Sequence, residues 1–93
     1  MLTRDFIGME VFDIDLRKIG KIKDLDIEKN TLQVNSLIVE LEDEVAKEII
    51  GEKPLFKKSV VIISRSFIEK IGDVVTLKNS VRELKAKIER FKE

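Results

Sequence analysis

The side chains most able to do chemistry in this chain are the carboxylates around its predicted hairpins. Asp13 and Asp15 lie beside one turn, and Asp24, Asp26 and Glu28 lead into the next. Carboxylate oxygens are the ligands that Ca²⁺ prefers, but a calcium loop gathers them on one compact turn with a central glycine. No such glycine is present here. We therefore interpret these carboxylates as solvated hairpin acids and predict no metal site.

The serines lack the neighbours that would turn a hydroxyl into a nucleophile. Ser59, Ser64, Ser66 and Ser80 occur in a chain without histidine, and none of them begins a Ser-x-x-Lys pattern. The glycines form neither a G-x-G-x-x-G loop nor a Walker-type loop for phosphate. We expect no catalytic residues, no cofactor and no enzymatic activity.

Composition narrows the class of protein further. The chain has 93 residues, which is one small domain, and 43% of them are apolar, which is too many for a disordered chain. It has no cysteine, which excludes disulfides and zinc–thiolate sites. Its 18 basic and 18 acidic residues give a net charge of zero, which argues against non-specific binding of nucleic acid.

The distribution of charge also bears on where the protein acts. No uncharged run approaches the ~20 residues of a membrane span, and the first residues lack the apolar stretch of a signal peptide. We expect a cytoplasmic protein with no membrane insertion. Lys and Glu are abundant while Asn, Gln and Met are few, a balance typical of thermophilic proteins.

β-Branched residues dominate the apolar part of the sequence and favour a sheet. There are 13 isoleucines and 9 valines. Residues 6–41 read as strands, and the alternation of apolar residues slips once near Lys23 and Asp24, as a β-bulge requires. Such slips, with Gly20, are typical of a strand that bends in a small barrel. Lys29 and Asn30 suit a tight hairpin turn.

The second half of the chain combines a short helix with further strands. Residues 43–50 have helical spacing and are followed by Gly51, a plausible stop. Val60 to Ile63 is an apolar run with polar residues on both sides, which predicts a strand, and residues 74–77 predict the last one. If one face of that run opens outward, Val61 and Ile63 form a contact surface; if both faces are covered, they are core.

The C-terminal segment, residues 79–93, predicts an amphipathic helix. Ser80 and Glu83 form a capping box at its start. An apolar stripe follows at spacings of 3, 4 and 3, formed by Val81, Leu84, Ile88 and Phe91. A helix this short is marginal alone, so the stripe must dock. It can dock on its own barrel or on a second subunit, and we single out these four residues as candidate interface residues.

Several segments taken together resemble a known family. Residues 8–13 (GMEVFD), 19–27 (IGKIKDLDI), 37–40 (LIVE) and 71–77 (IGDVVTL) resemble the PRC-barrel domain, in its short stand-alone archaeal form. The resemblance covers nearly all of residues 4–78, and we assign residues 1–78 to the barrel. Many family members carry glycine in the first hairpin turn, where this chain has residues 15–18 (DLRK).

The resemblance implies a small, highly curved β-barrel that docks proteins. Stand-alone archaeal members include the CdpB-type cell-division proteins, cytoplasmic adaptors that self-associate and bind SepF, which tethers FtsZ. By this resemblance we expect a homodimer or higher assembly and a partner of the SepF type, or another PRC-barrel protein, at the division site. The alternative is a ribosome- or RNA-associated factor, by analogy with the RimM barrel. A third class, a small-ligand binder, would use a barrel interior that should be filled by side chains at this size.

Overall fold

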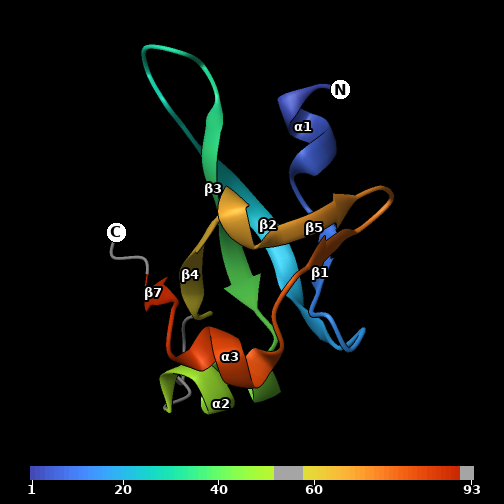
Figure 1. Cartoon of the computed structure of the whole chain (residues 1–93), viewed down its shortest axis with the longest axis vertical. Helices are drawn as coiled ribbons and strands as arrows, with labels where there is room; N and C mark the ends of the chain where they lie inside the picture. The colour runs from blue at the N-terminus through green and yellow to red at the C-terminus, as the bar shows by residue number, and fades with distance from the viewer. Residues whose placement is uncertain (52–57, 91–93) are drawn as a thin grey trace.

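A computed structural model of the chain describes residues 1–51 and 58–90, and the side chains of these residues apart from 89 and 90. Figure 1 shows the helices and strands along the chain. In order they are α1 (Thr3–Phe6), β1 (Glu10–Phe12), β2 (Lys18–Ile27), β3 (Val34–Leu41), α2 (Asp43–Ile50), β4 (Val60–Ser64), the 3-10 turn η1 (Arg65–Phe67), β5 (Ile68–Ile71), β6 (Val75–Leu77), α3 (Val81–Lys85) and β7 (Glu89–Arg90).

The strands form one curled sheet of seven strands in the order β5-β6-β1-β2-β3-β4-β7. Neighbours are antiparallel except β1 and β6, which are parallel. The turn η1 contacts β3 and leads the chain back over the sheet into β5. Among the described residues β5 and β7 are the two ends of the sheet, so it forms a half-barrel. The prediction of a mainly β, strongly curved fold is confirmed.

Two features of β2 bend the sheet. The pairing of β2 with β3 shifts between Ile22 and Asp24, which confirms the β-bulge predicted near Lys23. At Gly20, a side chain would run into the backbone carbonyl of Glu40. Glycine therefore lets β2 and β3 approach closely where the sheet curls.

The inserted helix lies where the sequence predicts it. α2 spans Asp43–Ile50, and Gly51 ends it in the left-handed region at φ 87°. The Gly51 amide donates to the Lys47 carbonyl, as in a glycine helix stop. Val45 and Ala46 of α2 are buried, and the helix packs against α3.

The C-terminal segment differs from the prediction of one helix over residues 79–93. The capping box is present, because Ser80 Oγ accepts from the Glu83 amide while Glu83 Oε1 accepts from the Ser80 amide. The helix nevertheless ends at Lys85, and Glu89–Arg90 pairs with Ile62 and Val61 of β4. The prediction of a long helix is therefore wrong. Strand pairing satisfies backbone groups along the edge of β4 that a longer helix would leave unpaired.

The interior of the half-barrel is filled by apolar side chains from the sheet and from two helices, as expected for a barrel of this size. The largest fully buried ones come from β1, β2, β3, β4, α2, β6 and α3: Val11, Ile19, Ile22, Leu37, Val39, Leu41, Val45, Val61, Ile63, Val75, Leu77 and Leu84. In the part of the chain that the structure describes, no helix is long and apolar enough to cross a membrane.

Candidate interaction surfaces

Four of the predicted interface residues lie inside the chain's own core. Val61 and Ile63 of β4 are 0% exposed, as is Leu84 of α3, and Val81 is 4% exposed. The interpretation of these four as contact residues for a second protein is wrong, and the alternative of an intramolecular core holds for them. The reason is that Val61 and Ile63 of β4 and Val81 and Leu84 of α3 all belong to one cluster of buried apolar side chains inside the chain.

The other two predicted interface residues have different outcomes. Ile88 is half-buried and packs against the edge of the core. Its role as a contact residue stays a prediction. Phe91 lies outside the described residues.

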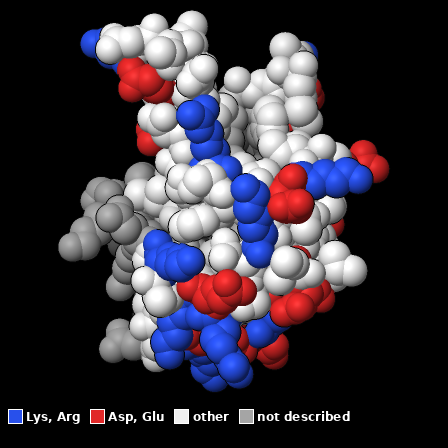
Figure 2. Space-filling model, viewed as in Figure 1, with Lys and Arg blue, Asp and Glu red and all other residues white. Residues whose placement is uncertain are grey.

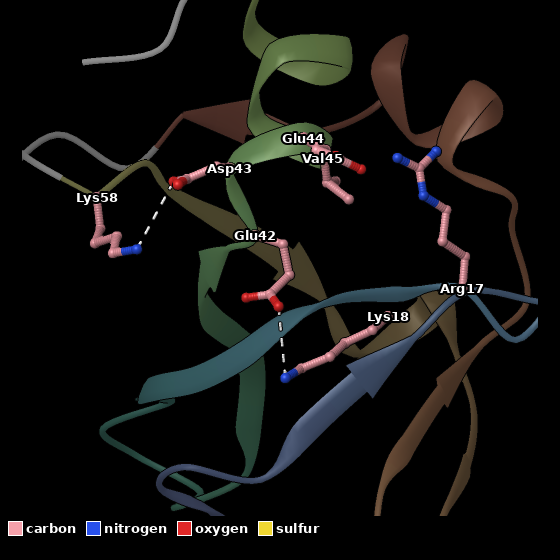
Figure 3. A pocket seen from close by; sticks show the side chains of 7 residues that line it. All are labelled: Arg17, Lys18, Glu42, Asp43, Glu44, Val45 and Lys58. Carbon is pink, nitrogen blue, oxygen red and sulfur yellow. Dashed lines mark ion pairs between the residues drawn. The ribbon is translucent and has the colours of Figure 1, made fainter. Parts of the chain in front are cut away.

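One open pocket of about 510 Å³ lies between the start of α2 and the start of β2. Figure 3 shows the side chains around it, with the ion pairs from Lys18 to Glu42 and from Lys58 to Asp43. The Lys18 ammonium is 2.9 Å from Glu10 and 3.5 Å from Glu42. Lys58 is 3.7 Å from Asp43, and the Arg17 guanidinium turns out of the pocket to Glu48 at 2.9 Å.

The chemistry of this pocket is that of paired surface charges. The hydrogen bond from Lys18 to the Glu10 carboxylate raises the pKa of the Lys18 ammonium above its ordinary value of 10.5, and the charges of Glu10 and Glu42 add to the effect. A lysine held protonated in this way is a poor base or nucleophile. Among the described residues no three Asp or Glu side chains are grouped so that they could hold a metal ion.

Asp13 has a structural role that the sequence reading missed. Asp13 is only 2% exposed, so the interpretation as a solvated hairpin acid is wrong for this aspartate. Oδ1 accepts from the amides of Asp15 and Arg17 at 3.0 and 2.8 Å, and Oδ2 accepts from the Val81 amide at 3.1 Å. The Ile14 amide adds a bond to the Asn79 carbonyl at 3.1 Å. Asp13 thereby fixes the β1–β2 turn against the first turn of α3.

The β1–β2 turn ends in exposed apolar side chains. Leu16 is 74% exposed and Ile14 is 53% exposed. The backbone of Leu16 has φ 65°, in the left-handed region that glycine and asparagine adopt far more readily than leucine. We call Ile14 and Leu16, with the adjoining residues 78–85, the turn end.

The β2–β3 hairpin has a similar tip. Leu32 is 77% exposed with φ 60°, and Ile27 is 41% exposed. The predicted tight turn at Lys29 and Asn30 is wider than expected, because the Glu28 amide donates to the Gln33 carbonyl and the Leu32 amide donates to the Glu28 carbonyl. We call residues 24–36 the hairpin end.

The N-terminal segment and the β5–β6 turn carry the remaining large exposed apolar side chains of the described chain. Met1, Leu2 and Ile7 flank α1, and Ile71 ends β5. Figure 1 shows α1 and the hairpin end at the same end of the molecule, opposite α2 and α3. The sequence reading did not single these residues out.

Comparison with known protein families identifies one family that matches most of the chain. The family described as PRC-barrel domain matches residues 1–84, which takes in the whole sheet up to β6 and most of α3. No curated protein matches the chain.

Proposed function

Because the chain belongs to the PRC-barrel family, we propose that it is a non-catalytic adaptor that self-associates and docks a second protein. The PRC-barrel is a general fold found in protein-interaction and ribosome-associated proteins. One observation carries the proposal: the large exposed apolar side chains lie on turns, at strand ends and at the N-terminal segment, outside a filled core. Exposed apolar groups of this kind mark contact sites when they cluster.

The polar features support binding over catalysis. The cations around the 510 Å³ pocket are each neutralised by a carboxylate. The chain has no cysteine and no histidine. The buried carboxylate of Asp13 is occupied by three backbone amides. The positions of these cations and of the Asp13 carboxylate are thus accounted for by structural contacts.

The resemblance to short archaeal PRC-barrel proteins supports a specific partner. We propose that the protein acts in the cytoplasm of a thermophilic archaeon, forms homodimers or higher assemblies, and docks a SepF-type protein linked to FtsZ or another PRC-barrel protein at the division site. Zero net charge is compatible with a protein partner.

The test is light scattering on the purified protein, followed by calorimetric titration with the SepF protein of the same organism. We expect association in both experiments. A strict monomer that binds no partner would contradict the proposal. Ile7→Ser and Ile71→Ser form a matched pair, because the two isoleucines are 44% and 43% exposed on different segments. Loss of SepF binding in only one of them identifies the docking side.

A ribosome- or RNA-associated role is the second candidate, and one observation favours it. Lys78, Arg82 and Lys85 are exposed around α3, and within the described part of the chain none of them forms an ion pair. Such cations are available to phosphates. This role predicts salt-sensitive co-sedimentation with ribosomal particles, and the adaptor role predicts none.

A further inference from the structure

We propose that residues 86–90 form a two-state strap. In the observed state they turn away from α3 and pair with β4 as strand β7. In the second state they leave β4 and continue α3 as a helix, which uncovers the outer edge of β4. This conformational device lies within one chain, so it goes beyond the proposed adaptor function and does not depend on it.

The sequence of the strap favours a helix. Residues 86–90 read AKIER. Alanine, lysine, glutamate and arginine are among the strongest helix formers, and the first three of these are depleted in strands. Ile88 lies four residues after the buried Leu84 on the apolar stripe, and Glu83 and Lys87 have the spacing of a favourable helical ion pair. A strand built from helix formers is a conflict between local preference and fold, which marks functional or strained sites.

Helix α3 ends without a stop signal. α2 ends at Gly51, whose left-handed backbone at φ 87° terminates a helix. α3 is followed by Ala86, which stays in the right-handed region at φ −86° and ψ −11°. Residues 73–93 contain neither glycine nor proline. Helical bonding even runs past the end of α3, because the Ile88 amide donates to the carbonyl of Leu84, four residues earlier, at 3.0 Å. The start of the strap is therefore already close to helical.

Few bonds hold the described part of the strap in the strand state. β7 consists of Glu89–Arg90 and pairs with two residues of β4. The Leu41 amide donates to the Ser59 carbonyl, and with the register of β3 and β4 this bond directs the odd-numbered residues of β4 toward β3. The backbone of Ile62 therefore points toward β7. Ile62 and its partner Glu89 form the hydrogen-bonded pair of this ladder and exchange two N–H···O bonds.

A continued helix would replace these two bonds by two others. The Glu89 amide would donate to the Lys85 carbonyl, four residues earlier. The Arg90 amide would donate to the Ala86 carbonyl in the same way. The N–H and C=O groups of Ile62 would then lie at an open edge of the sheet, where water binds them, so no buried polar group would lose its partner. Because the two states offer equal numbers of bonds, their free energies differ little and both are populated.

Charge does not tie the strap to either state. Figure 2 shows Lys and Arg side by side with Asp and Glu at the lower end of the molecule, where α2 and α3 lie. The strap itself carries both signs, with Lys87 and Arg90 beside Glu89. A mixed surface gives no strong field of one sign that would hold such a segment. The choice between the states therefore depends on backbone bonding and helix preference, which single substitutions shift.

The experiment is hydrogen–deuterium exchange of the full chain, followed by NMR at single amides. The Ile62 amide reports release of the strap. The amides of Val61 and Ile63 point toward β3 and report opening of the sheet. After correction for intrinsic rates, we expect Ile62 to exchange at least about a hundredfold faster than these two neighbours. Equal protection of the three amides would mean that the strap stays on β4, and would overturn the inference.

Lys87→Gly and Lys87→Ala distinguish a helical second state from a frayed one. Residue 87 is exposed, and both variants remove the same charged side chain. Glycine disfavours a helix by about fivefold relative to alanine, so exchange at Ile62 should be about fivefold slower in Lys87→Gly than in Lys87→Ala.

A frayed strap predicts the opposite order, because glycine adds freedom to a disordered segment. That order, or equal rates in the two variants, overturns the inference. The Cα chemical shifts of Glu89 and Arg90 give a second readout and should lie closer to strand values in Lys87→Gly. SepF binding and self-association are measured separately, so failure of the strap leaves the adaptor proposal standing.

Discussion

Helix α3 and the β1–β2 turn lie against each other, yet they place their leucines in opposite surroundings. Leu84 of α3 is 0% exposed, whereas Leu16 of the turn is 74% exposed. The two segments are joined by Asp13, whose carboxylate accepts from the Val81 amide. Helical spacing thus indicates that a face is apolar but leaves open what covers it. A turn held in the left-handed region by its own hydrogen bonds can keep a leucine outside the core.

The largest expected effect separates these two leucines. Leu84→Asp buries a charge in the core and should destabilise the protein by about 4 kcal/mol or more, enough to unfold a domain of this size. Leu16→Asp should change the free energy of unfolding by less than about 0.5 kcal/mol, because the side chain is in water. Urea unfolding followed by circular dichroism measures both. Equal effects of the two substitutions would refute the assignment of α3 to the core.

The next effect concerns the carboxylate that connects the two segments. Asp13→Ala removes the acceptor of three backbone amides, and we expect a loss of about 3 kcal/mol. The neighbouring Asp15 is exposed and is the matched control, with an expected change within about 0.5 kcal/mol for Asp15→Ala. Urea unfolding followed by circular dichroism measures the stability of both variants. An Asp13→Ala variant as stable as Asp15→Ala would mean that the turn does not depend on this anchor.

A smaller effect tests the start of α3. Ser80→Ala removes the hydroxyl that accepts from the Glu83 amide and should cost about 1 kcal/mol. Ser66→Ala is a suitable comparison, since Ser66 is exposed and its hydroxyl contacts only that of Ser64. Thermal melts of both variants measure the difference. A Ser80→Ala melting temperature equal to that of Ser66→Ala would show that the cap contributes nothing.

The smallest expected effect is a pH dependence of the protein's stability that comes from Glu83. The Ser80 amide, helped by the Asn79 and Ser80 side chains, lowers the pKa of the Glu83 carboxyl below its ordinary value of 4.5. Because the folded pKa is the lower one, this stabilisation is present above pH 4.5 and is lost as the pH falls through the folded pKa. Wild type should therefore lose slightly more stability than Glu83→Gln in that range. Equal losses of stability in wild type and Glu83→Gln as the pH falls would contradict this prediction.

Local patterns predicted much of the fold because the physics behind them is local. The bulge near Lys23 follows from a slip in alternation, and the stop at Gly51 follows from its left-handed backbone. The prediction of one helix over residues 79–93 was wrong, because Glu89–Arg90 pairs with β4. This pairing is a long-range contact that no local spacing reveals.

The candidate surfaces were harder to predict than the fold. Val61 and Leu84 have the pattern of an apolar face, and only the packed structure shows that the chain covers them itself. Leu16 and Leu32 have no periodic pattern at all, since an exposed leucine at a turn is defined by its backbone angle.

Hydrogen–deuterium exchange of the assembled protein against the dilute protein tests the central claim, that the turns and not the helix stripe face other molecules. We expect slower exchange on assembly at the amides of residues 14–17 and 28–33, with the amides of α3 around Leu84 unchanged. Protection confined to α3, or scattered over the sheet with both turns unaffected, would contradict the account.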